Sequence, residues 1–238
     1  MQRYFVSSSE TGKIKIDDQD IFHMSHVMRY KKDDQFEIND DGKIYLAKIV
    51  SFDPFEFEII NEILENHELD GFIRLLYCLP KGDKLELVIQ KAVELGVDEV
   101  VLINSSRSIK RIDENSKEKK LIRFNRIIKE ASEQSKREKK MKLDDVIEFD
   151  KISNYPSDIS LIAYENTACT LNDLKEILKE VKGKTINILV GAEGGFSKDE
   201  VEKAKFCGFK EISLGKRILR SETAAIYIMS LLSCFMDE

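Results

Sequence analysis

The 238-residue sequence lacks the features that place a protein in a membrane or in an oxidising compartment. No apolar run approaches the roughly 20 residues that span a bilayer, and the N-terminal residues lack the pattern of a signal peptide. The four cysteines are scattered without a Cys-x-x-Cys pair, which argues against a disulfide framework and a zinc site. We therefore expect a cytoplasmic protein with free thiols, no metal and no membrane partner.

A glycine-rich stretch at residues 189–197 follows an apolar run, residues 186–190, that is typical of a buried strand. Ser197 and Glu200 have the spacing of a capping box, so a helix is expected to begin directly after the glycines. Backbone N–H groups in such a loop can approach a ligand closely. The glycine spacing matches neither the dinucleotide fingerprint nor the phosphate loop. Taken alone, the stretch fits a cofactor loop and a plain tight turn about equally well.

A second loop lies one strand later, at residues 214–224, with the sequence Leu-Gly-Lys-Arg-Ile-Leu-Arg-Ser-Glu-Thr-Ala. It ends a strand expected at residues 211–214 and opens an apolar helix expected at residues 222–236. In open parallel α/β sheets, ligands bind outside the carboxyl ends of the strands. Two loops at the ends of consecutive strands would therefore line one pocket.

The first 70 residues hold one helical pattern, at residues 17–30, among short strand patterns. The segment Asp40-Asp41-Gly42 between two of these strands is a strong hairpin signal. Short strands with a single helix predict a small β-barrel. The strands are expected at residues 3–6, 35–39, 43–52 and 56–64.

The pattern changes after a polar segment at residues 67–71. From there on strands and helices alternate, which favours a parallel α/β sheet. One of these helices, at residues 116–140, is expected to be long and basic. We therefore expect two domains, residues 1–70 and 71–238.

The two loops together, Gly-Ala-Glu-Gly-Gly-Phe-Ser and Leu-Gly-Lys-Arg-Ile-Leu-Arg-Ser-Glu-Thr-Ala, resemble the signature of the 16S ribosomal RNA (uracil-N3)-methyltransferases. The resemblance covers the whole chain. It implies a C-terminal knotted parallel sheet of the SPOUT class, with a trefoil knot, after an N-terminal PUA-like RNA-binding β-barrel. It also implies S-adenosyl-L-methionine (AdoMet) as cofactor, 16S rRNA of the small ribosomal subunit as partner, and a homodimer. One departure is Ala192, where the family usually has proline, and we expect it to loosen the turn slightly.

The net charge of −6 argues at first sight against a nucleic-acid partner, but its distribution is uneven. Residues 117–142 hold eleven Lys or Arg against four Glu, a local charge of +7. This segment fits an RNA-binding face and a solvated charged helix about equally well.

The resemblance assigns cofactor contacts to both loops. Ile218 and Leu219 would hold the adenine between them, although plain core packing is the alternative for these two side chains. The predicted contacts are Leu189, Val190, Gly191, Glu193, Gly194 and Gly195 in the first loop, and Leu214, Gly215, Ile218, Leu219 and Arg220 in the second.

Uracil N3 carries a proton and is a poor nucleophile until that proton leaves. Glu193 is a candidate general base, because burial would raise the pKa of its carboxyl group. It could equally tie the loop by accepting backbone N–H bonds. Arg220 is the better candidate for stabilising negative charge on the uracil oxygens, with a phosphate contact or an ion pair to Glu222 as alternatives.

RNA contacts are expected at more widely spread positions. Gln134 and Arg137 lie in the sequence Glu-Ala-Ser-Glu-Gln-Ser-Lys-Arg, which matches a pattern of the family. A helix-surface pairing with Glu130 or Glu133 is the alternative for both. The predicted substrate contacts are Arg3, Arg29, Lys81, Arg107, Gln134 and Arg137.

Two other functions remain open from the sequence. One is a knotted methyltransferase that acts on a different RNA target, such as a tRNA ribose or guanine. The other is a non-catalytic RNA-binding or ribosome-assembly factor with a relict pocket. The apolar last helix could form the dimer interface, although a buried core helix would have the same pattern.

Overall fold

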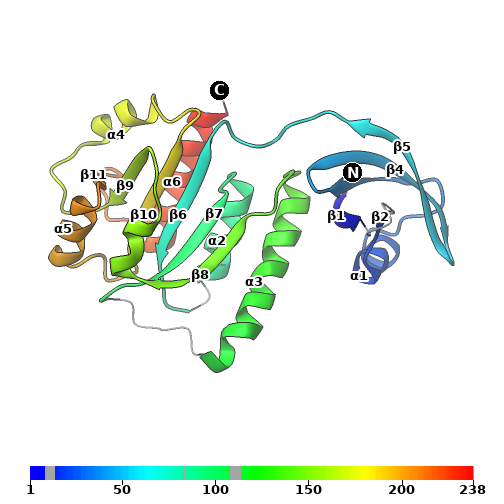
Figure 1. Cartoon of the computed structure of the whole chain (residues 1–238), viewed down its shortest axis with the longest axis horizontal. Coiled ribbons are helices and arrows are strands. Elements are labelled where there is room, and N and C mark those ends of the chain that lie inside the picture. Colours follow the sequence, from blue (N-terminus) through cyan, green and yellow to red (C-terminus); the bar gives the residue numbers. More distant parts are fainter. Residues whose placement is uncertain (9–13, 83, 108–113, 238) are drawn as a thin grey trace. The chain divides into compact units, whose positions relative to one another are not determined.

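A computed structural model describes residues 1–8, 14–82, 84–107 and 114–237 (Figure 1). The chain divides into two compact units. The first unit comprises Met1–Glu68 and Lys129–Lys140, and the second comprises Leu69–Ile128 and Met141–Glu238. The sequence placed a boundary near residue 70, but it did not indicate that a segment as distant as Lys129–Lys140 joins the N-terminal unit.

The first unit is built on a five-stranded sheet of order β2-β1-β3-β4-β5. The β3–β4 hairpin turns at Asp41 and Gly42, whose φ angles of 50° and 87° are those that a two-residue hairpin turn requires. β1 is parallel to β3, whereas the other pairs are antiparallel, and β2 and β5 form the edges of the sheet. The strands are β1 (Arg3–Ser8), β2 (Ile14–Lys15), β3 (Gln35–Asp40), β4 (Lys43–Phe52) and β5 (Phe55–Ile63).

The expected helix at residues 17–30 forms in two parts. Asp17 caps α1 (Asp18–Phe22) by accepting a hydrogen bond from the Gln19 backbone N–H, and the chain continues as the π-helix η1 (His23–Val27). Met24 of this segment is fully buried in a core with Tyr4 and Phe36.

The second unit is an α/β fold around a six-stranded sheet of order β11-β9-β10-β6-β7-β8, in which every pair is parallel. β6 and β10 lie at its centre, and their side chains are buried on both faces, which explains their continuous apolar sequences. The strands are β6 (Phe72–Cys78), β7 (Glu99–Asn104), β8 (Lys142–Glu148), β9 (Ile159–Ala163), β10 (Thr185–Val190) and β11 (Lys210–Ile212).

The helices follow the predicted alternation with two differences. The long helix begins at Glu114 and ends at Gln134 rather than at residue 140, because Lys136 takes a left-handed conformation with φ 63°. A short 3-10 helix, η2 (Phe149–Asn154), was not expected. The helices are α2 (Lys84–Glu94), α3 (Glu114–Gln134), α4 (Leu171–Leu178), α5 (Lys198–Phe206) and α6 (Ser221–Met236).

The strand order determines where a ligand site can form. β10 has β9 as a neighbour, and β9 has β11 on its other side, so the carboxyl ends of these three strands meet at one edge of the sheet. The two glycine-bearing loops follow β10 and β11. Among the described residues, no helix is long and apolar enough to cross a membrane, and no cluster of side chains is arranged to hold a metal ion.

Candidate cofactor pocket

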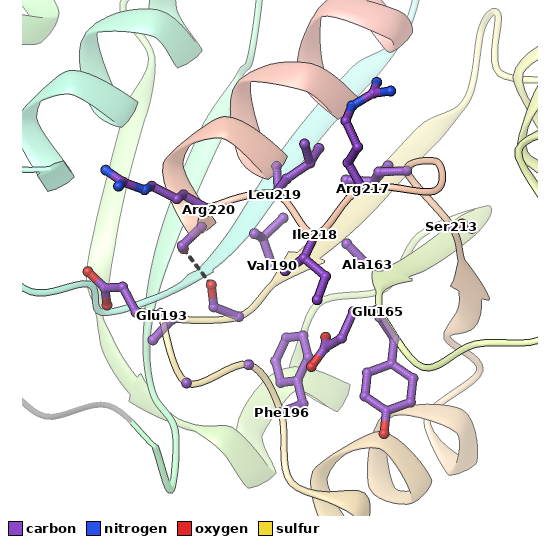
Figure 2. Close-up of a pocket in the computed structure, with 18 of the residues that line it drawn as sticks. Ala163, Glu165, Val190, Glu193, Phe196, Ser213, Arg217, Ile218, Leu219 and Arg220 are labelled. Atoms are coloured by element: carbon purple, nitrogen blue, oxygen red, sulfur yellow. Dashed lines mark hydrogen bonds between the residues drawn. The ribbon is translucent and has the colours of Figure 1, made fainter.

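Both predicted loops line one cavity of about 370 Å³ at this edge of the sheet (Figure 2). Gly195 from the first loop and Leu219 from the second share it, as the sequence predicted. Phe196 anchors the first loop, since its buried ring packs edge-on against Phe149 of η2. The predicted residues that line the cavity are Val190, Gly191, Glu193, Gly194, Gly195, Leu214, Gly215, Ile218, Leu219 and Arg220.

Leu189 is the exception, and its side chain does not line the cavity. Successive side chains along a strand point to opposite faces, and that of Leu189 lies fully buried in a core cluster with Leu76 and Val101. The side chain of Leu189 therefore does not contact the cavity, and its backbone groups stay candidates for the predicted cofactor contact.

The first loop is a compact turn that leaves little room for a Cβ at its three glycines. The Gly195 N–H donates to the Ala192 carbonyl (2.9 Å), so the turn closes with Ala192 in place of the usual proline. Gly195 has φ +63°, in the left-handed region that favours glycine. A Cβ on Gly194 would lie 3.1 Å from Cβ of Arg107, whose guanidinium donates to the Gly194 carbonyl (2.7 Å). Arg107 thus binds the loop itself.

The second loop presents apolar side chains to the cavity. Ile218 is 87% exposed although it is strongly hydrophobic, and it projects into the pocket (Figure 2). The alternative that Ile218 is a core residue is wrong. An apolar side chain left uncovered beside a cavity is typical of a surface that a ligand covers.

A buried pair of hydroxyl groups ties the start of α6 to the first loop. Ser221 Oγ lies 2.5 Å from the Gly191 carbonyl and 2.9 Å from Tyr77 Oη. A serine hydroxyl has one proton, so Ser221 donates to Gly191 while Tyr77 donates to Ser221. Burial raises the pKa of Tyr77 far above its ordinary value, which keeps this donor protonated. The hydrogen bonds fix one loop relative to the other.

A third wall of the cavity was missed from the sequence. The segment after β9 contributes Ala163, Tyr164 and Glu165, and the Glu165 carboxylate lies 2.9 Å from the position of a Cβ on Gly195. The sequence predicted the strand that precedes this segment. It did not predict that this strand lies between β10 and β11. The other unpredicted lining residues are Ala192, Phe196, Ser213, Lys216, Arg217, Ser221 and Ala224.

Glu193 lies at the rim of the cavity and is held by several donors. Its carboxylate accepts from the Lys81 backbone N–H (3.0 and 3.2 Å) and lies 3.3 Å from the Lys84 ammonium. Partial burial acts to raise the pKa of Glu193, but the backbone N–H groups of Glu193 and Lys81, together with Lys84, outweigh it and lower the pKa. The expectation of a raised pKa is therefore wrong. The observed hydrogen bonds match the alternative interpretation, in which Glu193 holds the loop in place by accepting backbone N–H bonds.

Arg220 ends the second loop at the N-terminus of α6, with its side chain exposed. Among the described residues, its guanidinium makes no hydrogen bond or ion pair. Glu222, the expected alternative partner, lies 3.2 Å from Lys84 instead. Arg220 is therefore free to meet a ligand.

Comparison with known proteins identifies the family. Residues 67–233 match the RNA methyltransferase domain family, and residues 16–60 match the RNA methyltransferase PUA domain family. The ribosomal RNA small subunit methyltransferase E of Bacillus subtilis is 33% identical over 98% of this chain and 96% of its own. That of Mesomycoplasma hyopneumoniae is 31% identical over all of both chains. The chain belongs to the family of the ribosomal RNA small subunit methyltransferases E.

Two solved structures of bacterial methyltransferases share the fold. The enzyme from Neisseria gonorrhoeae, bound to S-adenosyl methionine, aligns with a TM-score of 0.84 at 28% identity, over 98% of this chain and 97% of its own. A methyltransferase from Legionella pneumophila in complex with the same cofactor aligns with a TM-score of 0.84 at 27% identity, over 98% of both chains. The α/β methyltransferase domain and the PUA domain predicted from the sequence are thus confirmed.

Two residues predicted to bind RNA are buried in the first unit of this family member. Arg3 is 0% exposed, and its guanidinium donates to Glu37 (2.9 Å) and Glu138 (3.4 Å). Arg137 is 2% exposed and pairs with Glu68 (2.6 Å). Because their guanidinium groups are already bound to carboxylates inside the unit, the predictions that Arg3 and Arg137 contact RNA are wrong.

The other four predicted RNA contacts are accessible. Gln134, Arg29, Lys81 and Arg107 are exposed. Arg29 has φ 56°, an unusual conformation for a residue other than glycine. Gln134 lies at the end of α3, where the neighbouring Glu133 accepts from the Phe5 backbone N–H (3.1 Å) and pairs with Lys129 (3.1 Å). These four residues stay candidates for substrate binding.

Replacing Arg137 with alanine is expected to destabilise the first unit. Glu68 would remain largely buried without its cation, and breaking a buried pair in this way costs about 3–5 kcal/mol. Urea denaturation followed by circular dichroism measures the change. The control is Gln134→Ala on the same segment, whose side chain is exposed and whose loss should change the free energy of unfolding by less than about 0.5 kcal/mol. A stable Arg137→Ala protein with weakened RNA binding would restore Arg137 as an RNA contact.

Proposed function

We propose that this protein transfers a methyl group from AdoMet to N3 of a uridine in 16S rRNA of the small ribosomal subunit. The observation that carries the proposal is the convergence of the two glycine-bearing loops on one cavity. The volume of this cavity, about 370 Å³, lies within the range of roughly 300–1,000 Å³ that is usual for small-molecule sites. The name of the relatives, and the cofactor in the two related structures, agree with this function.

The lining of the cavity fits AdoMet. Ile218 and Leu219 offer apolar surface to an adenine ring, and the glycines of the first loop let backbone groups approach the cofactor. Glu165 adds negative charge to one wall, which suits a cationic ligand. When bound, AdoMet supplies an electrophilic methyl group on its sulfonium. The role of the loops is to hold donor and acceptor in line, from which most of the acceleration is expected.

Arg220 has the chemistry to stabilise the acceptor. Loss of the N3 proton leaves negative charge on the uracil oxygens, and a free guanidinium beside the cavity favours that anion. Glu193 has a lowered pKa and is held by Lys81 and Lys84, so we assign it the positioning of the first loop. The proton at N3 then leaves to solvent or to a group of the RNA.

We further propose a homodimer, in which a second copy completes the pocket, and a cytoplasmic location, where ribosomal RNA is found. Met229 and Leu232 of α6 are fully buried within the protomer, so they belong to its core. Ile226 and Phe235 are half-buried, and they remain candidates for the interface. The trefoil knot also stays a prediction.

The proposed function is tested with the purified protein, small-subunit ribosomal RNA and AdoMet carrying an isotopically labelled methyl group. Nuclease digestion and mass spectrometry should find the label in 3-methyluridine. Label in a ribose or in guanine would support the alternative of another methylation target. Absence of AdoMet binding in isothermal titration calorimetry would support a ribosome-assembly factor with a relict pocket.

A further inference from the structure

Lys84 lies at the rim of the pocket between two carboxylates. It is the first residue of α2, directly after the segment that follows β6. Its ammonium is 3.3 Å from Glu193 Oε1 and 3.2 Å from Glu222 Oε2. Glu193 belongs to the first loop, whereas Glu222 lies in the first turn of α6, so one cation joins a loop that lines the cavity to the start of this helix.

Glu222 depends on this contact. Its Oε2 atom is buried and makes no other hydrogen bond among the described residues. The hydrogen bond to Glu222, and to a smaller extent that to Glu193, raises the pKa of Lys84 and keeps it charged. Without Lys84, a buried carboxylate would lack a counter-charge, which is strongly unfavourable.

Arg220 is the cation that would replace Lys84. It precedes Glu222 by two residues, and its side chain extends toward the same side of the pocket as Glu193 (Figure 2). In the described part of the chain, the guanidinium is bound to neither carboxylate. A long, flexible side chain beside an uncompensated carboxylate would pair with it.

We infer that Lys84 is a positioning residue: by neutralising Glu222 and Glu193, it keeps Arg220 free for the substrate. The inference rests on the proposed function, in which Arg220 stabilises the uracil anion. Lys84 is not among the residues that line the cavity, so it acts through Arg220. Two acidic side chains, Glu193 in the pocket lining and Glu222 in α6, thereby lie near the catalytic arginine without drawing it into an internal ion pair.

The test is methyl transfer by Lys84→Met, which keeps the length of the side chain and removes the charge. Because Arg220 is then drawn into an ion pair, kcat should fall about tenfold, while the Kd for AdoMet stays within about twofold. The double variant Lys84→Met/Glu222→Gln removes the competing carboxylate and should bring kcat back to within about threefold of the wild type. Lys84→Arg should also keep most of the rate. Lys91→Met is the matched control, because Lys91 lies on the same helix and, among the described residues, its ion pair is a local one with Glu94 (2.7 Å).

Two results would overturn the inference. One is an unchanged kcat in Lys84→Met. The other is a loss of methyl transfer in Lys84→Met that the added Glu222→Gln substitution does not repair and that appears as a higher KM for RNA. That result would mean that Lys84 binds RNA directly. A crystal structure of Lys84→Met adds a readout independent of activity and should show the Arg220 guanidinium against Glu222 or Glu193. Should Lys84→Met fail to fold, Lys84→Gln is measured in the same way. Wild-type methyl transfer is measured first, and its absence would contradict the proposed function rather than the role of Lys84.

Discussion

Arg220→Ala is expected to lower kcat by about 10²–10³-fold, the usual cost of removing one group that stabilises a developing anion. The Kd for AdoMet should change by less than about threefold, because Arg220 lies at the rim of the cavity and the cofactor contacts come from other lining residues. Single-turnover kinetics with saturating AdoMet measures the first quantity, and isothermal titration calorimetry measures the second.

Arg217→Ala is the matched control for Arg220. Arg217 lies in the same loop and is also exposed, but its side chain points away from that of Arg220 (Figure 2). The Arg217→Ala substitution removes the same charge from the loop as Arg220→Ala does, but kcat should fall less than about fivefold. If Arg220→Ala loses AdoMet binding in parallel with activity, Arg220 is a cofactor contact and not a catalytic residue.

Gly195→Val is expected to weaken AdoMet binding by at least about 100-fold. A β-branched residue at φ +63° is strained by about 1–3 kcal/mol. The new Cβ would also press on the Glu165 carboxylate, 2.9 Å away, and the added methyl groups would enter the cavity. The measurement is isothermal titration calorimetry with AdoMet at a temperature where the variant is folded.

Gly183→Val separates the effect on the pocket from the backbone strain. Gly183 has φ +70°, and no atom lies within 4 Å of the position of its Cβ. This variant carries the same strain outside the pocket, so it should lose stability and keep its affinity for AdoMet. Equal affinity in the two variants would mean that the first loop does not contact the cofactor.

The sequence predicted the two loops because their local patterns are strong. Glycine is favoured where φ is positive or backbone groups approach closely, as at Gly195. The Ser197–Glu200 capping box forms as expected: the Glu200 N–H donates to Ser197 Oγ (3.2 Å), and the Ser197 N–H donates to Glu200 Oε2 (2.8 Å). β8 was missed, because its sequence Lys-Leu-Asp-Asp-Val-Ile-Glu belongs to an edge strand that is only half-buried. Its polarity does not distinguish an edge strand from a loop.

Long-range partners explain the other errors. Arg3 and Arg137 have the residue type of a phosphate contact, but their carboxylate partners, Glu37 and Glu68, lie 34 and 69 positions away in the chain. Nothing in the local sequence shows which of the many acidic residues will neutralise them. The same holds for Lys84, whose two partners come from segments more than 100 residues later.

A crystal structure of the protein with AdoMet tests the central claim most directly. The adenine should lie against Ile218 and Leu219, backbone groups of both loops should contact the cofactor, and its methyl group should face the side of the pocket where Arg220 lies. A cofactor bound elsewhere, or in contact with only one of the two loops, would contradict the claim that these loops together hold the methyl donor.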